Sequence, residues 1–337
     1  MGQKKNEIDI SLIIPTYNSQ KYILKTIASC QKFLANYRYE LIIVDDGSKD
    51  NTINVIKNRF KNIKILKENH SGVSCARNLG IATAAGRYIM FCDSDDLLIG
   101  TLPDYDFKED IISFSKNCSE KEYKTKEEKL ALIAGLFGLN LKDRERISIN
   151  GGSYSKLFNR DLLIDNNIMF CEKLQNSEDV LFNAESIVHA KSVRTISQGI
   201  YLYVKRNTSV THVIDMGLFK NHIIFLNKIF KTINLLSSTK NISVETELIE
   251  KIKSLYLYQL VFRYFVYCNP QKYRADYSTY KKIYQNNKNW SNDLNRKVEA
   301  ITITIINKFG LENAVYFSKL YLLSKKVLKR QEKSRIL

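Results

Sequence analysis

Three carboxylates lie within four residues at the end of an apolar run. The run Tyr88–Cys92 is followed directly by Asp93, Asp95 and Asp96. Carboxylates this close repel one another and resist burial, so a compensating cation is expected. Mg²⁺ and Mn²⁺ prefer carboxylate oxygens and share them with substrate phosphates. The spacing therefore favours a site for a hard divalent cation; the alternative is that Asp95 and Asp96 only begin the next turn.

The segments that would position these carboxylates alternate between strand and helix patterns. Four segments predict strands, and helical patterns separate them: Ile10–Ile14, Leu41–Val44, Ile63–Leu66 and Tyr88–Cys92. The first is typical of a strand buried on both faces. This order predicts an α/β fold with a mainly parallel sheet flanked by helices. Such sheets bind ligands beyond the carboxyl ends of their strands. We therefore expect the polar segments that follow the strands to share one rim of the sheet.

A phosphate-bearing substrate is expected beside such a cation, but the familiar phosphate-binding loops are missing from the sequence. No G-x-x-x-x-G-K-[ST] motif occurs, and no G-x-G-x-x-G follows the first strand. These absences argue against a P-loop NTPase and against a dinucleotide-binding Rossmann site. The cation itself is then expected to hold a diphosphate.

Five segments in order over residues 10–185 resemble the family 2 glycosyltransferases of bacterial cell-surface polysaccharide and glycoconjugate synthesis. They are "SLIIPTYN", "ELIIVDDGSKDNT", "NHSGVSCARNLGI", "GRYIMFCDSDD" and "NSEDVLFN". The resemblance implies the Rossmann-like GT-A fold and an inverting, metal-dependent transfer of a hexose or N-acetylhexosamine. The sugar would come from a UDP-sugar, and a hydroxyl of a glycan, lipid-linked or glycoprotein acceptor would receive it.

The resemblance also implies which residues bind the nucleotide-sugar: Pro15, Thr16, Tyr17, Asp45, Asn69, Arg77, Asp93 and Ser94. The first three would line the base pocket, with Tyr17 stacking on the base, and Asp45 would accept a base N–H. Asp93-Ser94-Asp95 is the D-x-D motif of the family. Asp95 would ligate Mn²⁺ or Mg²⁺ directly, and Asp93 would reach the ribose or the metal shell.

Glu178 and Asp179 match the catalytic acid pair of the family. An inverting transfer needs one carboxylate that takes the proton from the attacking hydroxyl. We assign this role to Asp179, with Glu178 orienting it or contacting the acceptor; the alternative is a plain acidic helix start. His212, in "YVKRNTSVTH", is the third candidate metal ligand, although a lone histidine is more often a surface or core residue.

The sequence also predicts two domains. Residues 1–215 would form the catalytic domain, with a nucleotide-sugar part over 1–100 and an acceptor part over 101–215. Residues 216–337 have a helical pattern and would form a smaller all-helical domain. Its last stretch, "FSKLYLLSKKVLKRQEKSRIL", is basic and amphipathic, which suits an anionic membrane surface or a homo-oligomer contact equally.

The overall charge restricts the partners. The chain has 52 Lys+Arg against 35 Asp+Glu, a formal +17, which favours a polyanionic partner without choosing one. A nucleotidyltransferase and a basic nucleic-acid-binding protein are the alternatives. "PTYNSQKY" lacks the glycine-rich loop of the first, and no nucleic-acid-binding motif supports the second, so we expect no nucleic acid.

Cysteine usage and hydropathy indicate where the protein acts. The six cysteines contain no C-x-x-C pair, no signal-peptide pattern opens the chain, and no run of about 18 apolar residues occurs. We therefore expect a reducing, cytoplasmic location, with peripheral association at the inner face of the plasma membrane.

Overall fold

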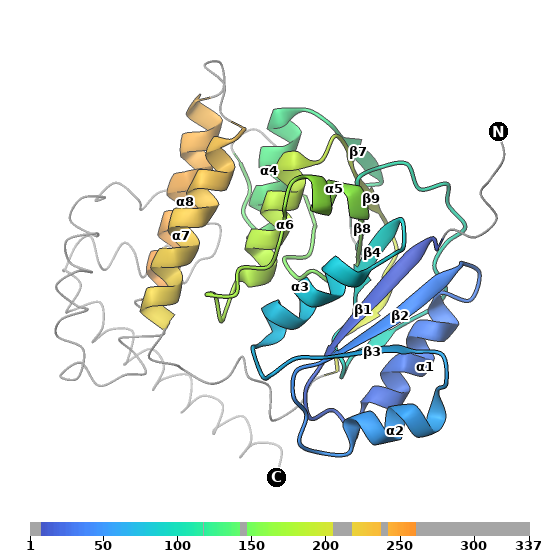
Figure 1. The fold of residues 1–337 in the computed structure, drawn as a ribbon. Helices are drawn as coiled ribbons and strands as arrows, with labels where there is room; N and C mark the ends of the chain where they lie inside the picture. The colour runs from blue at the N-terminus through green and yellow to red at the C-terminus, as the bar shows by residue number, and fades with distance from the viewer. Residues whose placement is uncertain (1–7, 117, 142–146, 205–217, 237–241, 261–337) are drawn as a thin grey trace, which may run out of the picture. The chain divides into compact units, whose positions relative to one another are not determined.

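The computed structural model describes residues 8–116, 118–141, 147–204, 218–236 and 242–260 (Figure 1). The chain divides into two compact units, one of residues 1–213 and 227–241 and one of residues 214–226 and 242–337. Each unit is described by itself. The predicted domains 1–215 and 216–337 stay a prediction.

The first unit contains all the described strands. They are β1 Ile10–Thr16, β2 Tyr39–Asp45, β3 Lys64–Lys67, β4 Tyr88–Phe91, β5 Leu97–Leu98, β6 Ile111–Phe114, β7 Lys121–Tyr123, β8 Lys156–Asn159, β9 Val193–Ile196 and β10 Tyr201–Leu202. The described helices are α1 Ile23–Phe33, α2 Thr52–Arg59, α3 Val73–Thr83, α4 Lys126–Leu136, α5 Arg160–Asp165, α6 Glu178–His189, α7 Leu218–Asn234 and α8 Ile242–Leu260.

Eight strands form one sheet in the order β3-β2-β1-β4-β8-β6-β9-β7. The strands β3, β2, β1 and β4 run parallel, with Thr16 of β1 beside Asp45 of β2. β8 enters antiparallel between β4 and β6, and β9 returns parallel to β6. The predicted mainly parallel sheet flanked by helices is confirmed, and the antiparallel β8 is an addition that the sequence pattern did not indicate.

Helices cover both faces of the parallel half. The alternate β1 residues Ile10, Leu12 and Ile14 pack in one core with Ile23 and Ile27 of α1. Ile13 points to the opposite face, where a Cβ added to Gly80 of α3 would lie 2.4 Å from its Cγ2. Glycine at this position therefore lets α3 approach β1 closely, and α3 is the helix that carries Arg77 to the rim.

The loop after β1 joins the loop after β2. The Asn18 side chain accepts a hydrogen bond from the Lys49 N–H at 2.8 Å, and α1 begins only at Ile23, with Tyr22 as its N-cap.

The strands β9 and β10, on either side of Gln198-Gly199, do not pair with each other. β9 joins the large sheet beside β6 and β7, whereas β10 pairs antiparallel with β5. The segment between them therefore carries the chain from the sheet to the residues that follow the D-x-D motif.

The helices α7 and α8 lie within residues 216–337, for which an all-helical domain is predicted. The remaining residues of that prediction, including the basic C-terminal stretch, lie outside the described residues. Among the described helices, none combines the length and the apolar character needed to cross a membrane.

Candidate active site

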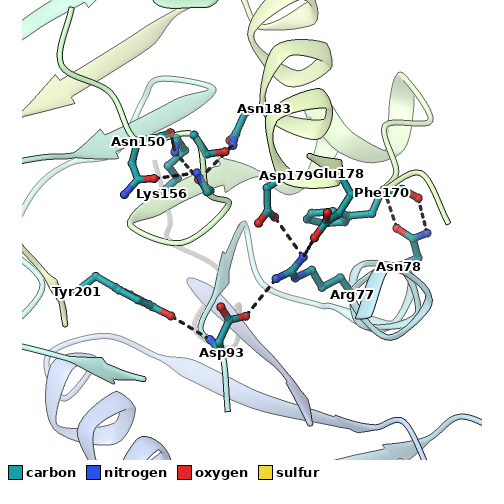
Figure 2. A network of polar contacts seen from close by, with 12 residues as sticks. Arg77, Asn78, Asp93, Asn150, Lys156, Phe170, Glu178, Asp179, Asn183 and Tyr201 are labelled. Carbon is teal, nitrogen blue, oxygen red and sulfur yellow. Dashed lines mark hydrogen bonds and ion pairs between the residues drawn. The ribbon is translucent and has the colours of Figure 1, made fainter. Parts of the chain in front are cut away.

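The carboxyl ends of β1, β2 and β4 lie side by side, because β1 pairs in parallel with both of its neighbours. This register brings the loops after the three strands to one rim, as the sequence predicted. Arg77 of α3 meets the acid pair, in the first turn of α6, at the same rim, as Figure 2 shows.

Arg77 is the centre of the site. Its Nη1 donates to Glu178 Oε1 at 3.3 Å and to Asp179 Oδ1 at 3.2 Å, and its Nη2 donates to Asp93 Oδ1 at 3.1 Å (Figure 2). One guanidinium therefore joins the first aspartate of the D-x-D motif to the predicted catalytic pair. The sequence assigned Arg77 to the nucleotide; the structure places its charge on three carboxylates.

The Arg77 side chain is fixed by packing as well as by charge. The residue is 4% exposed, and its guanidinium carbon lies 5.0 Å from the centre of the Phe170 ring, a cation–π arrangement. Asn78 holds Phe170 through its side-chain amide, which donates to the Phe170 carbonyl at 3.0 Å and accepts from the Phe170 N–H at 2.8 Å. Neighbouring positions of α3 thus supply the cation and fix the ring beneath it.

Burial and negative charge shift several pKa values in this cluster. Burial opposes the charge of Arg77, but the carboxylates of Asp179, Asp93 and Glu178 outweigh it and raise the Arg77 pKa. Burial, followed by the charge of Asp179, raises the pKa of Glu178 to about 7 despite the nearby guanidinium. Burial likewise raises the pKa of Asp93. The site therefore holds more negative charge than Arg77 neutralises, which suits an added cation.

The D-x-D turn is anchored by side chains from outside the motif. Asp96 is 1% exposed and accepts from the Tyr201 hydroxyl at 2.7 Å and from the Val204 N–H at 2.9 Å. The Ser94 hydroxyl lies 2.6 Å from that of Ser19, inside the protein. Asp96 thus fixes the turn, while the side chains of Asp93 and Asp95 are partly exposed.

The predicted base pocket contains a pair of stacked rings. Tyr17 is 39% exposed, and its ring stacks on His70 at 4.5 Å between centres. His70 Nδ1 lies 3.5 Å from a carboxylate oxygen of Asp46. The same carboxylate accepts from the N–H groups of Ser71 and Gly72 at 2.6 and 3.0 Å, which fixes the start of α3.

The other residues predicted for the nucleotide differ in exposure. Pro15, Thr16 and Asp45 are buried, and Asn69 is exposed. The Thr16 hydroxyl donates to the Ile14 carbonyl at 3.1 Å, and the Asp45 carboxylate accepts from the Ser48 N–H at 3.2 Å. Tyr17 is therefore the member of the Pro15–Tyr17 segment whose side chain is most open to a ligand.

The acid pair lies in the first turn of α6, as predicted. Ser177 is the N-cap residue, but it adopts a left-handed conformation (φ +66°) and its side chain makes no capping hydrogen bond. Both acidic side chains instead turn to Arg77. The pair is therefore held by a buried charge rather than serving only as an acidic helix start.

The residues present fit a divalent cation only in part. The side chains of Asp93 and Asp95 follow β4 beside the negative cluster, and carboxylates of this kind bind Mg²⁺ or Mn²⁺ together with substrate phosphates. Among the residues that the structure describes, no three Asp, Glu, His or Cys side chains converge on a metal position. His212, the third predicted ligand, lies outside the described residues.

Buried polar atoms also indicate that a polar ligand belongs at this rim. Within the described part of the chain, Ser74 Oγ and Arg77 Nε are buried and have no hydrogen-bond partner. They lie three residues apart in α3, on the same face of the helix. Unpaired buried atoms of this kind are costly, and a bound ligand is one way to satisfy them.

Several residues of the network were not predicted from the sequence: Asn78, Phe170, Tyr201, Asn150, Lys156 and Asn183. Lys156 is 1% exposed and donates to two backbone carbonyls, although it reads in the sequence as an ordinary basic residue. The only local signal is its place directly before the apolar pair Leu157-Phe158.

Comparison with known proteins identifies the family. Residues 11–100 match the family described as Glycosyl transferase family 2. The chain is 30% identical over 251 residues to the poly(ribitol-phosphate) beta-N-acetylglucosaminyltransferase TarP of Staphylococcus aureus. The aligned region covers 66% of this chain and 72% of TarP. The chain belongs to glycosyltransferase family 2. It is therefore an enzyme, a glycosyltransferase, and the two alternative classes drawn from the sequence do not apply.

Two further relatives extend the comparison. The uncharacterized glycosyltransferase YibD of Escherichia coli is 26% identical over 67% of this chain and 71% of its own length. TarS of S. aureus, also named a poly(ribitol-phosphate) beta-N-acetylglucosaminyltransferase, is 29% identical over 58% of this chain but only 35% of its own length. The crystal structure of S. aureus TarS residues 1–349 with UDP covers 94% of this chain and 92% of that chain, with a TM-score of 0.61 and 18% identity. This likeness confirms the GT-A fold.

Proposed function

We propose that this glycosyltransferase moves a hexose or N-acetylhexosamine from a UDP-sugar to a hydroxyl of a cell-surface glycan acceptor, with inversion and with help from a divalent cation. TarS has been crystallised with UDP and with UDP-GlcNAc, and TarP and TarS are named N-acetylglucosaminyltransferases. These relatives support UDP-GlcNAc as the first sugar donor to test.

The observation that carries the proposal is the ion cluster around Arg77. A single buried guanidinium lies 3.1 Å from Asp93 and 3.2 Å from Asp179. The side chain of Arg77 thus contacts both the motif proposed to bind the diphosphate and the carboxylate proposed to contact the acceptor. An inverting transfer needs this closeness, because the attacking hydroxyl and the leaving diphosphate lie on opposite sides of one sugar carbon.

Each side chain then has a distinct task. Asp179 accepts the proton of the acceptor hydroxyl as that oxygen attacks the sugar carbon. Glu178 and Arg77 orient Asp179. Asp95 and Asp93 would hold Mn²⁺ or Mg²⁺, and the cation would neutralise the charge that develops on the departing diphosphate. Tyr17, beside His70, offers an aromatic face for the base.

The C-terminal part of the chain supports an anionic partner. Residues 205–337 carry 24 Lys+Arg and 9 Asp+Glu, so nearly all of the net charge of +17 comes from this region. A basic region of this kind favours an anionic surface. The proposal therefore includes peripheral binding at the cytoplasmic face of the membrane, where a lipid-linked acceptor would be presented.

A panel of nucleotide-sugars tests the transfer reaction. UDP release from UDP-GlcNAc, UDP-glucose, GDP-mannose and CDP-linked sugars is measured with Mn²⁺, Mg²⁺ or EDTA. We expect turnover of a UDP-sugar that requires the metal. Asp95→Ala should lose metal-dependent UDP binding, and Asp179→Asn should keep UDP binding while turnover falls by about 10²-fold or more. Asp165→Asn, an exposed carboxylate on α5, is the control.

Two results would contradict the proposal. Normal turnover by Asp179→Asn would remove the base assignment. A UDP affinity that is unchanged both by EDTA and by Asp95→Ala would contradict the assignment of Asp95 as a metal ligand.

Vesicle flotation tests the membrane contact. We expect the full chain to float with phosphatidylglycerol-containing vesicles at low salt and to detach as salt is raised, because screening weakens the attraction. Replacing Lys325, Lys326 and Lys329 by glutamate should weaken the binding. Equal partitioning of this variant and the wild type would end the membrane proposal.

A further inference from the structure

The loop of residues 150–152 is tied down by a buried lysine. Lys156, at the start of β8, donates from Nζ to the Asn150 carbonyl at 2.6 Å and to the Gly152 carbonyl at 2.7 Å (Figure 2). The residue is 1% exposed. Burial lowers the pKa of Lys156 to about 7, and the charge of Asp179 opposes that shift. A neutral amine still has two N–H donors, so both bonds can form in either protonation state.

A side chain of α6 holds the same loop from the other side. Asn183 Nδ2 donates to the Gly151 carbonyl at 2.8 Å and to the Gly152 carbonyl at 3.1 Å. Asn183 follows Asp179 by four residues, so both lie on one face of α6. A Cβ added to Gly151 would lie 3.3 Å from Val180 Cγ2, which shows that the loop packs against the turn that carries the base.

The loop also faces the D-x-D turn, through two aromatic rings. A Cβ at Gly152 would lie 2.3 Å from the Tyr154 ring, so any larger residue at this position would clash with the ring. Tyr154 stacks on Tyr201 at 4.2 Å between centres, and the Tyr201 hydroxyl donates to Asp96 and accepts from the Asp93 N–H. Residues 150–152 therefore contact the helix turn that carries the acid pair and, through Tyr154 and Tyr201, are connected to the D-x-D turn.

We propose that Lys156 and Asn183 are positioning residues for the transfer step, which hold the 150–152 loop as a wall of the acceptor side beside Asp179. This inference rests on the proposed role of Asp179 as the base. Burying the Lys156 side chain costs free energy, because its ammonium group loses its hydration. Its bond to Asn150 pairs a carbonyl that Asn183 does not reach, and at Gly152 it shares the carbonyl with Asn183, so the two side chains hold the loop together.

The test compares variants that remove the hydrogen bonds to the 150–152 loop with a lysine variant that leaves those bonds in place. Lys156→Met and Asn183→Leu remove the bonds to the loop, singly and together. Lys129→Met is the matched control, because Lys129 also donates to a carbonyl of α6, at Val188, but near the far end of the helix. UDP release from UDP-GlcNAc, with water as the acceptor, gives kcat and KM. Calorimetry gives the UDP Kd, and circular dichroism gives the folded fraction.

We expect kcat to fall about 10-fold or more in both single variants, because small displacements of reacting groups are costly. The UDP Kd and the KM should stay within about twofold of the wild type. The double variant should be no slower than the slower single variant, because both substitutions release the same loop. Lys156→Gln, which keeps N–H donors, should regain part of the lost rate.

Three outcomes would overturn the inference. They are unchanged kcat in both single variants, a loss of kcat equal to the loss of folded protein, or an equal loss in Lys129→Met. If Lys156→Met does not fold, Asn183→Leu decides the question by the same measurements. Asp179→Asn separates this inference from the proposed function. Normal turnover by Asp179→Asn would contradict the assignment of Asp179 as the base. An inactive Asp179→Asn together with fully active Lys156→Met and Asn183→Leu would contradict only the positioning role.

Discussion

Glu178 gives a sharp prediction about stability and pH. Its Oε1 lies 3.3 Å from Arg77 Nη1 and its side chain is 13% exposed. Burial, followed by the charge of Asp179, raises its pKa from 4.5 to about 7. The folded chain therefore holds a proton on Glu178 more tightly than the unfolded chain does. The stability from this group is complete below pH 4.5 and is lost as pH rises through 7.

The size of the effect follows from the two pKa values. Each pKa unit corresponds to 1.36 kcal/mol, so ionised Glu178 costs about 3 kcal/mol of unfolding free energy at pH 8 and less than about 1 kcal/mol at pH 5. Glutamine cannot ionise, yet its oxygen can still accept from Arg77. Glu178→Gln should therefore gain about 2 kcal/mol relative to the wild type between pH 5 and pH 8.

Urea unfolding followed by far-UV circular dichroism measures this difference. Wild type and Glu178→Gln are compared at pH 5, 6, 7 and 8, without nucleotide or divalent metal. Glu68→Gln, a carboxyl outside the Arg77 cluster, controls for the general effect of removing a glutamate. A stability difference that is constant over this range, or that falls as pH rises, would refute the electrostatic account of the cluster.

Two further substitutions test the supports of the site. Arg77→Met leaves three carboxylates without their shared cation, so it should lower the unfolding free energy by about 3 kcal/mol at pH 7 and by less at pH 5, since protonation relieves the repulsion; a small loss in urea unfolding that does not vary with pH would contradict this. Tyr201→Phe removes a donor to buried Asp96 and should cost about 1–3 kcal/mol and weaken UDP binding; an unchanged melting temperature and UDP Kd would show that the hydroxyl does not fix the turn.

Most of the parallel half of the fold was predictable because β1, β2 and β4 are mainly apolar; β3, at the edge of the sheet, contains Lys64 and is only partly buried. The run Ile10–Ile14, apolar except for Ser11, favours burial on both faces, and the polar residues at its end then lie at the rim. The antiparallel β8 was not predictable in this way. Its apolar signal is only the pair Leu157-Phe158, and its buried first residue is a lysine.

The site was predictable as a set of motifs but not as a network. The carboxylates Asp93, Glu178 and Asp179 are visible in the sequence, whereas their common partner Arg77 lies 16 residues from one and more than 100 from the others. The Lys156 bonds go to backbone carbonyls, which have no signature in the residue types. Contacts made by the backbone or across long separations depend on the finished topology, and a local pattern does not encode them.

The short pairing between β4 and β8 bears on how such enzymes diversify. Only Tyr88 and Ile89 of β4 are registered with β8, opposite Asn159 and Phe158. The predicted nucleotide-sugar part and acceptor part thus share a short backbone pairing here, and they are joined also by the pairing of β5 with β10 and by the bonds of Arg77 and Tyr201. A chimaera that exchanges the chain after residue 100 between relatives would have to carry over the partners of Arg77 and Asp96, and one that lost them should bind UDP more weakly.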